Sequence, residues 1–177
     1  MFQNKIYSIK NDRGEKLEVR EFIEAILNSH FSDILTDPRR NRLEYIETIT
    51  IKIMSLVSDK QNHLLMKTIT LQEVQEAVFQ MKVGTPSSLD GFGVNCFHHF
   101  WEMVKLDVWK IVEQSRISGR IFPALNATFL TMIPKCDGAD TPDKFRPICL
   151  CNVIYKIITK VIANRLKPIL PYLISLE

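Results

Sequence analysis

The sequence predicts an α+β domain that is mostly helical, and three observations support this. Long segments carry apolar residues at helical spacing, short β-rich segments flank turn residues, and 46% of the chain is hydrophobic. A chain of 177 residues with this composition can bury a core as one domain, or as one domain with a terminal appendage.

The predicted helices are defined by apolar residues three and four positions apart. In chain order they cover residues 20–35, 70–81, 94–115 and 152–167. The apolar stripe of the first comprises Phe22, Ile23, Ile26, Leu27, Phe31 and Leu35. Thr70 and Glu73 form a capping box that begins the second helix. Asn152 is expected to cap the last helix, its side chain accepting a free backbone N–H.

Two β-hairpins are predicted from turn residues between β-rich segments. Residues 5–17 form the first, with a turn through Asn11-Asp12-Arg13-Gly14. Residues 127–133 and 145–150 form the second, with its tip near Gly138. Residues 39–59 remain open between strand and helix, because β-branched ITITIKI competes with helical spacing.

Composition limits the classes of function. The N-terminus lacks the apolar segment of a secretory signal, and no apolar run approaches the ~20 residues of a membrane span, so we expect an intracellular protein, nuclear or cytoplasmic, with no membrane partner. The cysteines are Cys96, Cys136, Cys149 and Cys151. They form no C-x-x-C pair, so we expect free thiols and no metal site.

Basic residues are concentrated in the last third of the chain. No Asp or Glu occurs between Lys144 and Leu176, whereas the preceding part is close to neutral. Such asymmetry favours a polyanionic partner, although a solvated helix face gives the same count.

One long segment resembles a known family. FRPICLCNVIYKIITKVIANRLKPILPYLIS, residues 145–175, closely resembles the reverse transcriptase of plant LINE-type (non-LTR) retrotransposons, where FRPISLCNVIYKIISK precedes ANRLK and LP-x-LIS. Ile133-Pro134-Lys135 resembles the family's IPK, and Asp90-Gly91-Phe92 the end of its PGPDGF loop. Residues 71–81 are similar to the helix before that loop, and IYSIKNDRGEKL to the family's connector between endonuclease and polymerase.

The sequence departs from the family pattern at several positions. Ser87-Ser88-Leu89 stands where the family has Pro-Gly-Pro, so the loop lacks its stiff residues. Cys149 replaces a serine, and Lys144 stands where an aspartate is common. Drift of this kind fits a decaying genomic copy and fits divergence nearly as well.

The resemblance implies a domain organisation and a parent activity. Residues 1–67 would be the connector, and residues 68–177 a partial reverse transcriptase domain, the fingers of a right-hand polymerase truncated before the palm. The parent would be an RNA-directed DNA polymerase that adds deoxynucleotide triphosphates to a DNA primer on an RNA template, with magnesium. In this chain we expect no cofactor and no catalytic residue, because it ends before the palm aspartates that hold two metal ions.

Two sets of basic residues are candidate binding residues. By resemblance, Lys135 and Arg146 belong to the fingers hairpin over the incoming nucleotide; otherwise they are a strand-end lysine and a surface arginine. Candidates for template or primer phosphates are Lys156, Lys160, Arg165 and Lys167. The alternative for these four is the wet face of an ordinary amphipathic helix.

Several other polar residues receive structural interpretations. We expect Asp137, Asp140 and Asp143 to form a solvated hairpin tip rather than a metal site. Asp90 is expected to order its loop, and at least one of His98 and His99 to be a packed or rim histidine. Tyr155 could stack a base, but packing at the core edge is favoured. On the helix over residues 152–167, the apolar stripe is wide enough to predict an exposed patch near Ile158, Ile162 and Leu166.

Two other hypotheses compete with that of a polymerase fragment. The chain could be a catalytically dead nucleic-acid-binding module, or a non-functional pseudogene product.

Because the palm aspartates are missing from the sequence, we expect the purified chain to show no primer extension on an RNA template with magnesium and all four deoxynucleotides. Extension that exceeds a buffer control and survives repurification would contradict the truncated assignment.

Overall fold

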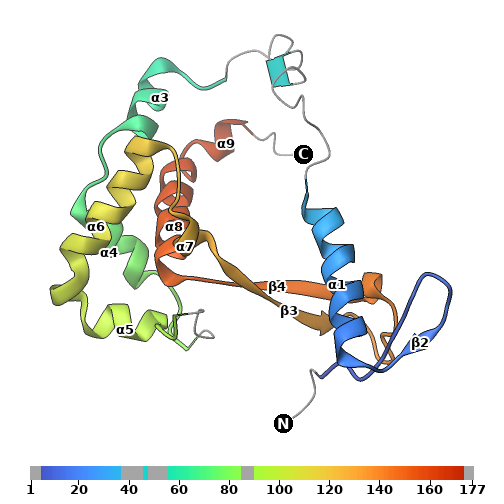
Figure 1. Ribbon diagram of the computed structural model, residues 1–177. Coiled ribbons are helices and arrows are strands. Elements are labelled where there is room, and N and C mark those ends of the chain that lie inside the picture. The colour runs from blue at the N-terminus through green and yellow to red at the C-terminus, as the bar shows by residue number, and fades with distance from the viewer. Residues whose placement is uncertain (1–4, 37–45, 48–55, 85–89, 174–177) are drawn as a thin grey trace. The chain divides into compact units, whose positions relative to one another are not determined.

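The computed structural model describes residues 5–36, 46–47, 56–84 and 90–173, which belong to two compact units (Figure 1). Unit 1 combines Met1–Lys52 with Leu130–Cys149, and unit 2 combines Ile53–Phe129 with Leu150–Glu177. This grouping does not test the predicted boundary between a connector, residues 1–67, and a polymerase portion, residues 68–177, which stays a prediction. Most of residues 39–59, open between strand and helix, lies outside the described residues.

Unit 1 begins with the predicted hairpin. Strands β1 (Ile9–Lys10) and β2 (Lys16–Leu17) pair antiparallel, with Ile9 opposite Leu17. The Asn11 side chain accepts the backbone N–H groups of Arg13 and Glu15, and Gly14 takes φ +79°, a left-handed conformation that glycine adopts without strain. The turn therefore forms where the sequence places it.

Helix α1 (Arg20–Leu35) follows β2 and is confirmed at the predicted bounds. Its buried residues are Ile23, Leu27 and Phe31, which join Ile9 and Phe145 in the core of unit 1. Phe22 was expected on the buried stripe, but it is 57% exposed. The correction follows from the size of the core, because a helix packed on a cluster of a few side chains buries a single i, i+4 row rather than a wide face.

The second predicted hairpin is also confirmed. Strands β3 (Thr128–Pro134) and β4 (Phe145–Cys151) pair in a two-stranded sheet, and residues 135–144 connect them. In this connection Gly138 takes φ +71°, and a 3-10 turn spans Pro142–Lys144. The division between the two units falls within both strands, so each strand contributes residues to both units.

Unit 2 is helical (Figure 1). In chain order its helices are α3 (Asp59–Met66), α4 (Leu71–Phe79), α5 (Val94–His99), α6 (Trp101–Ser118), α7 (Pro123–Asn126), α8 (Val153–Leu166) and α9 (Leu170–Leu173). The core lies where α4, α6 and α8 meet, and its most buried side chains include Val74, Val78, Val112, Ile157 and Val161. The Thr70 capping box is confirmed, since Thr70 Oγ1 accepts the Glu73 backbone N–H and Glu73 returns a carboxylate to the Thr70 N–H.

The single helix predicted over residues 94–115 is wrong, because the chain breaks at Phe100 into α5 and α6. A tertiary contact accounts for the separate α5. His98 Nε2 lies 2.8 Å from the Val78 carbonyl oxygen, and its ring stacks on Phe79 with centroids 4.7 Å apart. These contacts hold α5 to the end of α4, and they confirm His98 as a packed histidine.

Asn152 occupies the N-cap position of α8, but its predicted capping hydrogen bond is absent. Its Nδ2 instead donates to the carbonyl oxygens of Ala124 and Leu125, at 3.0 and 3.4 Å. The side chain is buried and ties α7 to the start of α8. The side chain therefore bonds carbonyls of α7, which are distant in the sequence, instead of capping its own helix.

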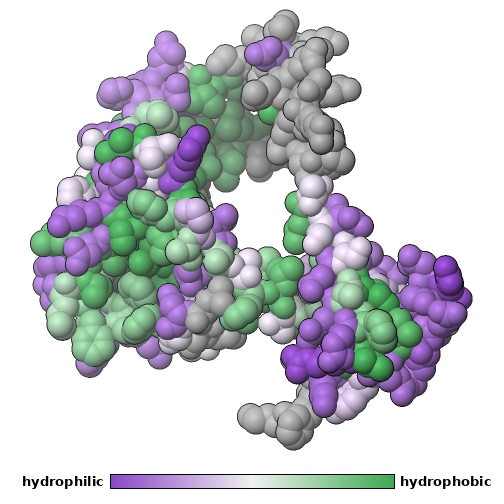
Figure 2. Space-filling model, viewed as in Figure 1, coloured by the Kyte–Doolittle hydropathy of each residue, from purple (hydrophilic) through white to green (hydrophobic). Residues whose placement is uncertain are grey.

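The apolar patch expected on α8 lies along a groove of unit 2. Ile158 is buried, whereas Ile162 is 50% exposed and Leu166 is 37% exposed. Both exposed side chains line a groove of about 380 Å³, together with Leu65, Ile69 and Val112 from α3, the segment after it, and α6. Figure 2 shows apolar side chains spread among hydrophilic ones over the helices of unit 2.

The groove gives a testable prediction. Replacing Ile162 with Gln should lower the fluorescence of an apolar-surface dye, while the unfolding free energy falls by less than about 1.5 kcal/mol, because this side chain is half exposed. Met103, 78% exposed on α6, supplies the matched control M103Q. Equal dye fluorescence for I162Q and M103Q would show that the groove is not where the dye binds.

Candidate nucleic-acid interface

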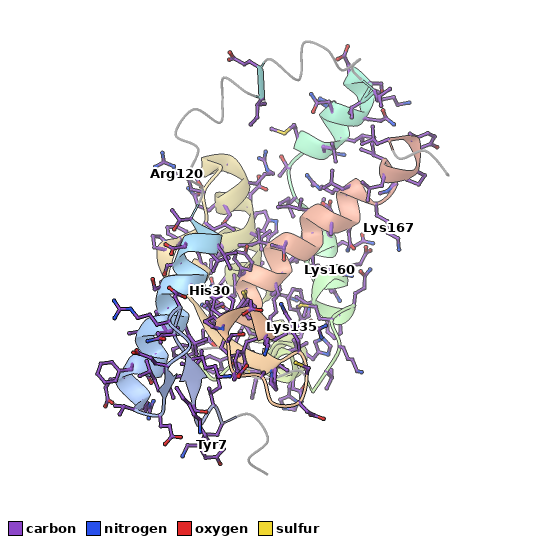
Figure 3. The ribbon with its side chains drawn as sticks, turned by 90° about the vertical axis from the view of Figure 1, so that its right-hand side faces the viewer. Tyr7, His30, Arg120, Lys135, Lys160 and Lys167 are labelled. Atoms are coloured by element: carbon purple, nitrogen blue, oxygen red, sulfur yellow. The ribbon has the colours of Figure 1, made fainter. Side chains whose placement is uncertain are left out.

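Buried and basic residues lie on different sides of helix α8. Val153, Ile157 and Val161 are buried at i, i+4 and i+8. Lys156 and Lys160 of α8 and Lys167, its C-cap residue, recur at i, i+4 and i+11, which places them along another side of this helix. We call these three lysines the cationic face. Figure 3 shows Lys160 and Lys167 on this part of the chain.

The cationic face is free for an external anion. Lys167 is exposed, and Lys156 and Lys160 are half-buried, so their apolar stems can pack while their ammonium groups reach water. Within the part of the chain that the structure describes, none of the three ammonium groups has an ion pair or hydrogen bond. Each can therefore meet a phosphate without breaking an internal contact.

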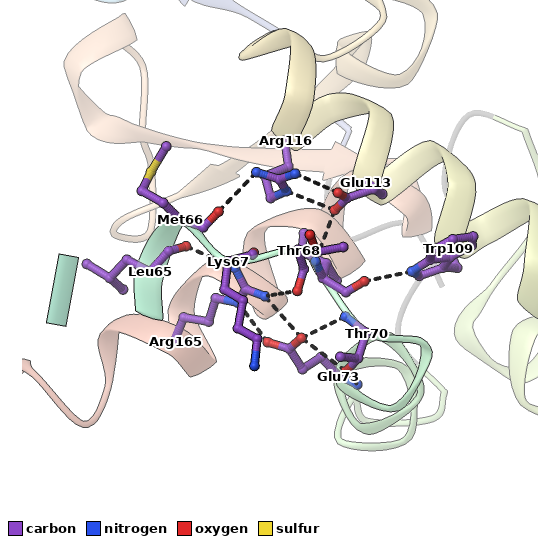
Figure 4. A network of polar contacts seen from close by, with 11 residues as sticks. Leu65, Met66, Lys67, Thr68, Thr70, Glu73, Trp109, Glu113, Arg116 and Arg165 are labelled. Atoms are coloured by element: carbon purple, nitrogen blue, oxygen red, sulfur yellow. Dashed lines mark hydrogen bonds and ion pairs between the residues drawn. The ribbon is translucent and has the colours of Figure 1, made fainter. Parts of the chain in front are cut away.

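Arg165, the fourth predicted phosphate contact, is placed differently (Figure 4). Its guanidinium donates to both carboxylate oxygens of Glu73 at 2.7 and 3.0 Å. It also donates to the carbonyl oxygens of Leu65, Lys67 and Thr68, at 2.9, 2.6 and 3.1 Å. A guanidinium has five N–H donors, and these bonds use all of them. A phosphate would have to displace one of these acceptors, so the predicted contact of Arg165 with nucleic acid stays a prediction.

A second Arg–Glu pair holds the same segment from α6. Arg116 donates to Glu113 at 2.6 and 2.9 Å and to the Met66 carbonyl at 3.0 Å. Glu113 accepts the Ile69 backbone N–H at 3.0 Å, and Trp109 Nε1 donates to the Ile69 carbonyl at 2.8 Å. Together with the Arg165–Glu73 pair, these contacts fix residues 65–70 between α6 and α8, and we call them the arginine clamp (Figure 4).

Both carboxylates of the arginine clamp are held in the charged state. The Arg165 hydrogen bond lowers the pKa of Glu73, with a further contribution from the Thr70 backbone N–H. The Arg116 hydrogen bond lowers the pKa of Glu113, helped by the Ile69 N–H. A carboxyl whose folded pKa is depressed stabilises the fold above its unfolded pKa, and this stabilisation is lost as the pH falls toward the folded pKa.

The predicted nucleotide contacts lie in unit 1. Lys135 is exposed; its Nζ donates to the Asp143 carbonyl at 2.6 Å, and its backbone N–H donates to the Lys144 carbonyl at 2.8 Å. Arg146 is exposed on β4, and its guanidinium makes no hydrogen bond or ion pair with a described residue. Lys135 is the first residue after β3, and Arg146 is the second residue of β4, so both lie where the connection meets the strands. The lysines of the cationic face belong to unit 2.

The three hairpin aspartates do not all point to solvent, which corrects the expectation of a solvated tip. Asp137 and Asp143 are exposed. Asp140 is 29% exposed and lies between Lys10 and Lys144, with N–O distances of 2.6 and 2.7 Å. These two ammonium groups lower the pKa of Asp140 to about 2. Among the described residues, no group of three His, Cys, Asp or Glu side chains could hold a metal ion.

Two further sequence expectations concern single residues. Asp90 Oδ1 accepts the Phe92 backbone N–H at 3.0 Å, which confirms its predicted loop-ordering role. Tyr155 is half-buried on α8, as packing at the core edge requires. Sequence reasoning missed Glu113 as a structural acceptor, and it predicted Glu73 as a capping residue without its contact to Arg165. The i, i+3 spacing of Glu113 and Arg116 was a usable signal, whereas nothing local links Glu73 to Arg165.

Comparison with known proteins adds a relative. No protein-family model matches the chain. "Transposon TX1 uncharacterized 149 kDa protein" of Xenopus laevis is 27% identical over 117 residues, which cover 66% of this chain. This chain is similar to a transposon protein. The similarity spans 9% of the length of that relative, so it concerns a small part of a much longer polypeptide. In the described residues, no helix has both the length and the apolar character to cross a membrane.

The arginine clamp should carry a measurable part of the stability. Replacing Arg165 with Met leaves the Glu73 carboxylate and three carbonyls without their donor, so the unfolding free energy should fall by about 3 kcal/mol near neutral pH. Lys167→Met, two residues further along and on an exposed side chain, should change it by less than about 0.5 kcal/mol. The measurement is urea unfolding at constant pH.

Acidification sharpens this test. Because the pKa of Glu73 is lowered in the folded chain, the difference between R165M and the unchanged chain should shrink as the pH falls below about 4.5, without vanishing, since the carbonyl contacts do not titrate. A difference that is small at neutral pH, or equal for R165M and K167M, would show that the clamp is dispensable.

Proposed function

We propose that the chain is part of the fingers of a LINE-type reverse transcriptase, an RNA-directed DNA polymerase of retrotransposons. The observation that carries this proposal is the 27% identity to a transposon protein, found for a chain whose residues 133–135 and 145–175 resemble reverse transcriptase motifs in the same order. The sequence similarity to a transposon protein and the resemblance of the motifs both favour a retrotransposon origin.

The cationic face is the proposed contact with template or primer. Its three lysines are free of internal partners in the described part of the chain, and each neutralised phosphate releases condensed counterions. Contacts of this type hold the backbone and do not read bases. Binding to RNA or DNA should therefore be weak, sensitive to salt and nearly independent of sequence.

Lys135 and Arg146 are the proposed contacts with the triphosphate of the incoming deoxynucleotide. The exposed guanidinium of Arg146 offers a planar fork to phosphate oxygens, and Lys135 adds a second positive charge. Magnesium is proposed for the parent enzyme alone. No catalytic step is assigned to the residues of this chain.

The apolar groove fits the same proposal. A polymerase fragment that is part of a longer protein would cover Ile162 and Leu166 with another portion of that protein.

A second candidate function, a catalytically dead nucleic-acid-binding module, is favoured by one observation: the cationic face needs no other part of a polymerase to meet phosphate. Primer extension by the longer transposon polypeptide, with and without this portion, separates the two.

The proposal predicts the salt dependence of binding. Replacing both Lys156 and Lys160 with Ala should flatten the slope of log affinity against log salt for single-stranded RNA by about 1.5, because two phosphate contacts are lost. Fluorescence anisotropy over a salt series gives the slope.

The matched control removes the same charge from elsewhere. Lys105 and Lys110 on α6 lie beside Glu102 and Asp107, so K105A/K110A should leave the slope unchanged. If both double variants shift the slope equally, binding reflects net charge alone and the cationic face is an ordinary wet surface.

A further inference from the structure

The N-terminal segment is bonded to the connection between β3 and β4. The Lys10 backbone N–H donates to the Asp140 carbonyl at 2.6 Å, and Lys10 Nζ meets the Asp140 carboxylate at 2.6 Å. Both contacts lie inside unit 1. They join residues that are far apart in the sequence, so the 135–144 connection takes its position partly from a hairpin at the other end of the chain.

From Asp140 the contacts continue to Lys135. Asp140 accepts Lys144 Nζ at 2.7 Å, the Lys144 carbonyl accepts the Lys135 N–H at 2.8 Å, and Lys135 Nζ donates to the Asp143 carbonyl at 2.6 Å. The path from Lys10 to Lys135 is thus continuous and consists of short polar contacts. A connection with a left-handed Gly138 and no regular strand gains part of its fixed shape from this path.

Burial anchors the other side of the connection. Phe145, the residue before Arg146, is 4% exposed and packs in the core of unit 1 with Ile9, which is fully buried beside Lys10. Arg146 therefore follows a residue that packs on the N-terminal hairpin, and Lys135 lies five residues before Asp140, which that hairpin bonds.

We propose that Lys10 and Asp140 are positioning residues for a phosphate-chain site at Lys135 and Arg146, and that the N-terminal segment is a working part of this site rather than a passive connector. The inference rests on the proposed function, which supplies the triphosphate ligand. It adds that an anionic residue improves the binding of an anion, because Asp140 orders the cations that make the contact.

The sign of the charge effect makes the inference testable. Asp140→Asn raises the net charge by one, so simple attraction predicts tighter binding of an anion. Positioning predicts the opposite: we expect about fivefold weaker binding of inorganic tripolyphosphate, measured by calorimetry on the full chain at low salt. Asp137→Asn makes the same charge change on the same connection, at an exposed residue without a Lys10 contact, and should bind no more weakly than the unchanged chain.

Variants of Lys10 test the other end of the contact. Lys10→Met should weaken tripolyphosphate binding and Lys10→Arg should retain it, because arginine can keep the ion pair. Lys16→Met is the matched loss of charge, since Lys16 lies opposite Lys10 in the hairpin and pairs with Glu18 instead. Hydrogen exchange without ligand reports the positions directly: D140N and K10M should speed exchange over residues 135–145, and D137N and K16M should not.

The two arms separate the possible failures. Binding by D140N that equals or exceeds binding by D137N overturns the positioning role. Unchanged exchange over residues 135–145 in both D140N and K10M would show that the Lys10–Asp140 contact does not order the connection, whatever the affinity. If the unchanged chain and K135A alike bind no tripolyphosphate, the proposed nucleotide contact fails, and the exchange measurement still decides whether the N-terminal hairpin orders the connection.

Discussion

Arg165 satisfies the backbone of a segment that has no regular structure. Residues 67–70 link α3 to α4, and their polar groups cannot all pair within a helix or a sheet. The Arg165 guanidinium donates to the carbonyls of Lys67 and Thr68, and Glu113 and Trp109 of α6 bond to Ile69. Arg116 adds a contact to the Met66 carbonyl at the end of α3. Because the clamp joins α3, α4, α6 and α8, the core and the groove of unit 2 both depend on it.

The clamp also explains why cations of one helix take different roles. Arginine presents a rigid fork that can serve a carboxylate and several carbonyls together, whereas a lysine ammonium is a mobile, strongly hydrated charge. On α8 the arginine points into the structure and is 13% exposed, while Lys160 and Lys167 remain without internal partners among the described residues. Counting positive charges along the sequence cannot separate these roles, since formal charge is the same for both.

Unit 1 uses a related device on a smaller scale. A carboxylate, Asp140, collects two lysines, and one of them comes from the N-terminal hairpin. In both units a charged side chain fixes an irregular segment by contacts that are distant in sequence. Such contacts are strongest when the partner geometry is already ordered, and here the buried neighbours Ile9 and Phe145 provide that order.

Local patterns in the sequence determined most of the secondary structure. Helices α1, α4 and α8, both hairpins and the Thr70 cap follow from helical spacing, turn residues and capping chemistry, which act over a few residues. The sequence alone also supplied the resemblance to reverse transcriptases and the candidate cations.

Only the tertiary structure decided the break at Phe100, the use of the Asn152 amide and the assignment of Arg165 to the clamp. Each depends on a partner that lies far away in the chain: the end of α4, the carbonyls of α7, and Glu73. Which acceptor a side chain with several donors bonds depends on distance and burial, and neighbouring residues in the sequence determine neither quantity.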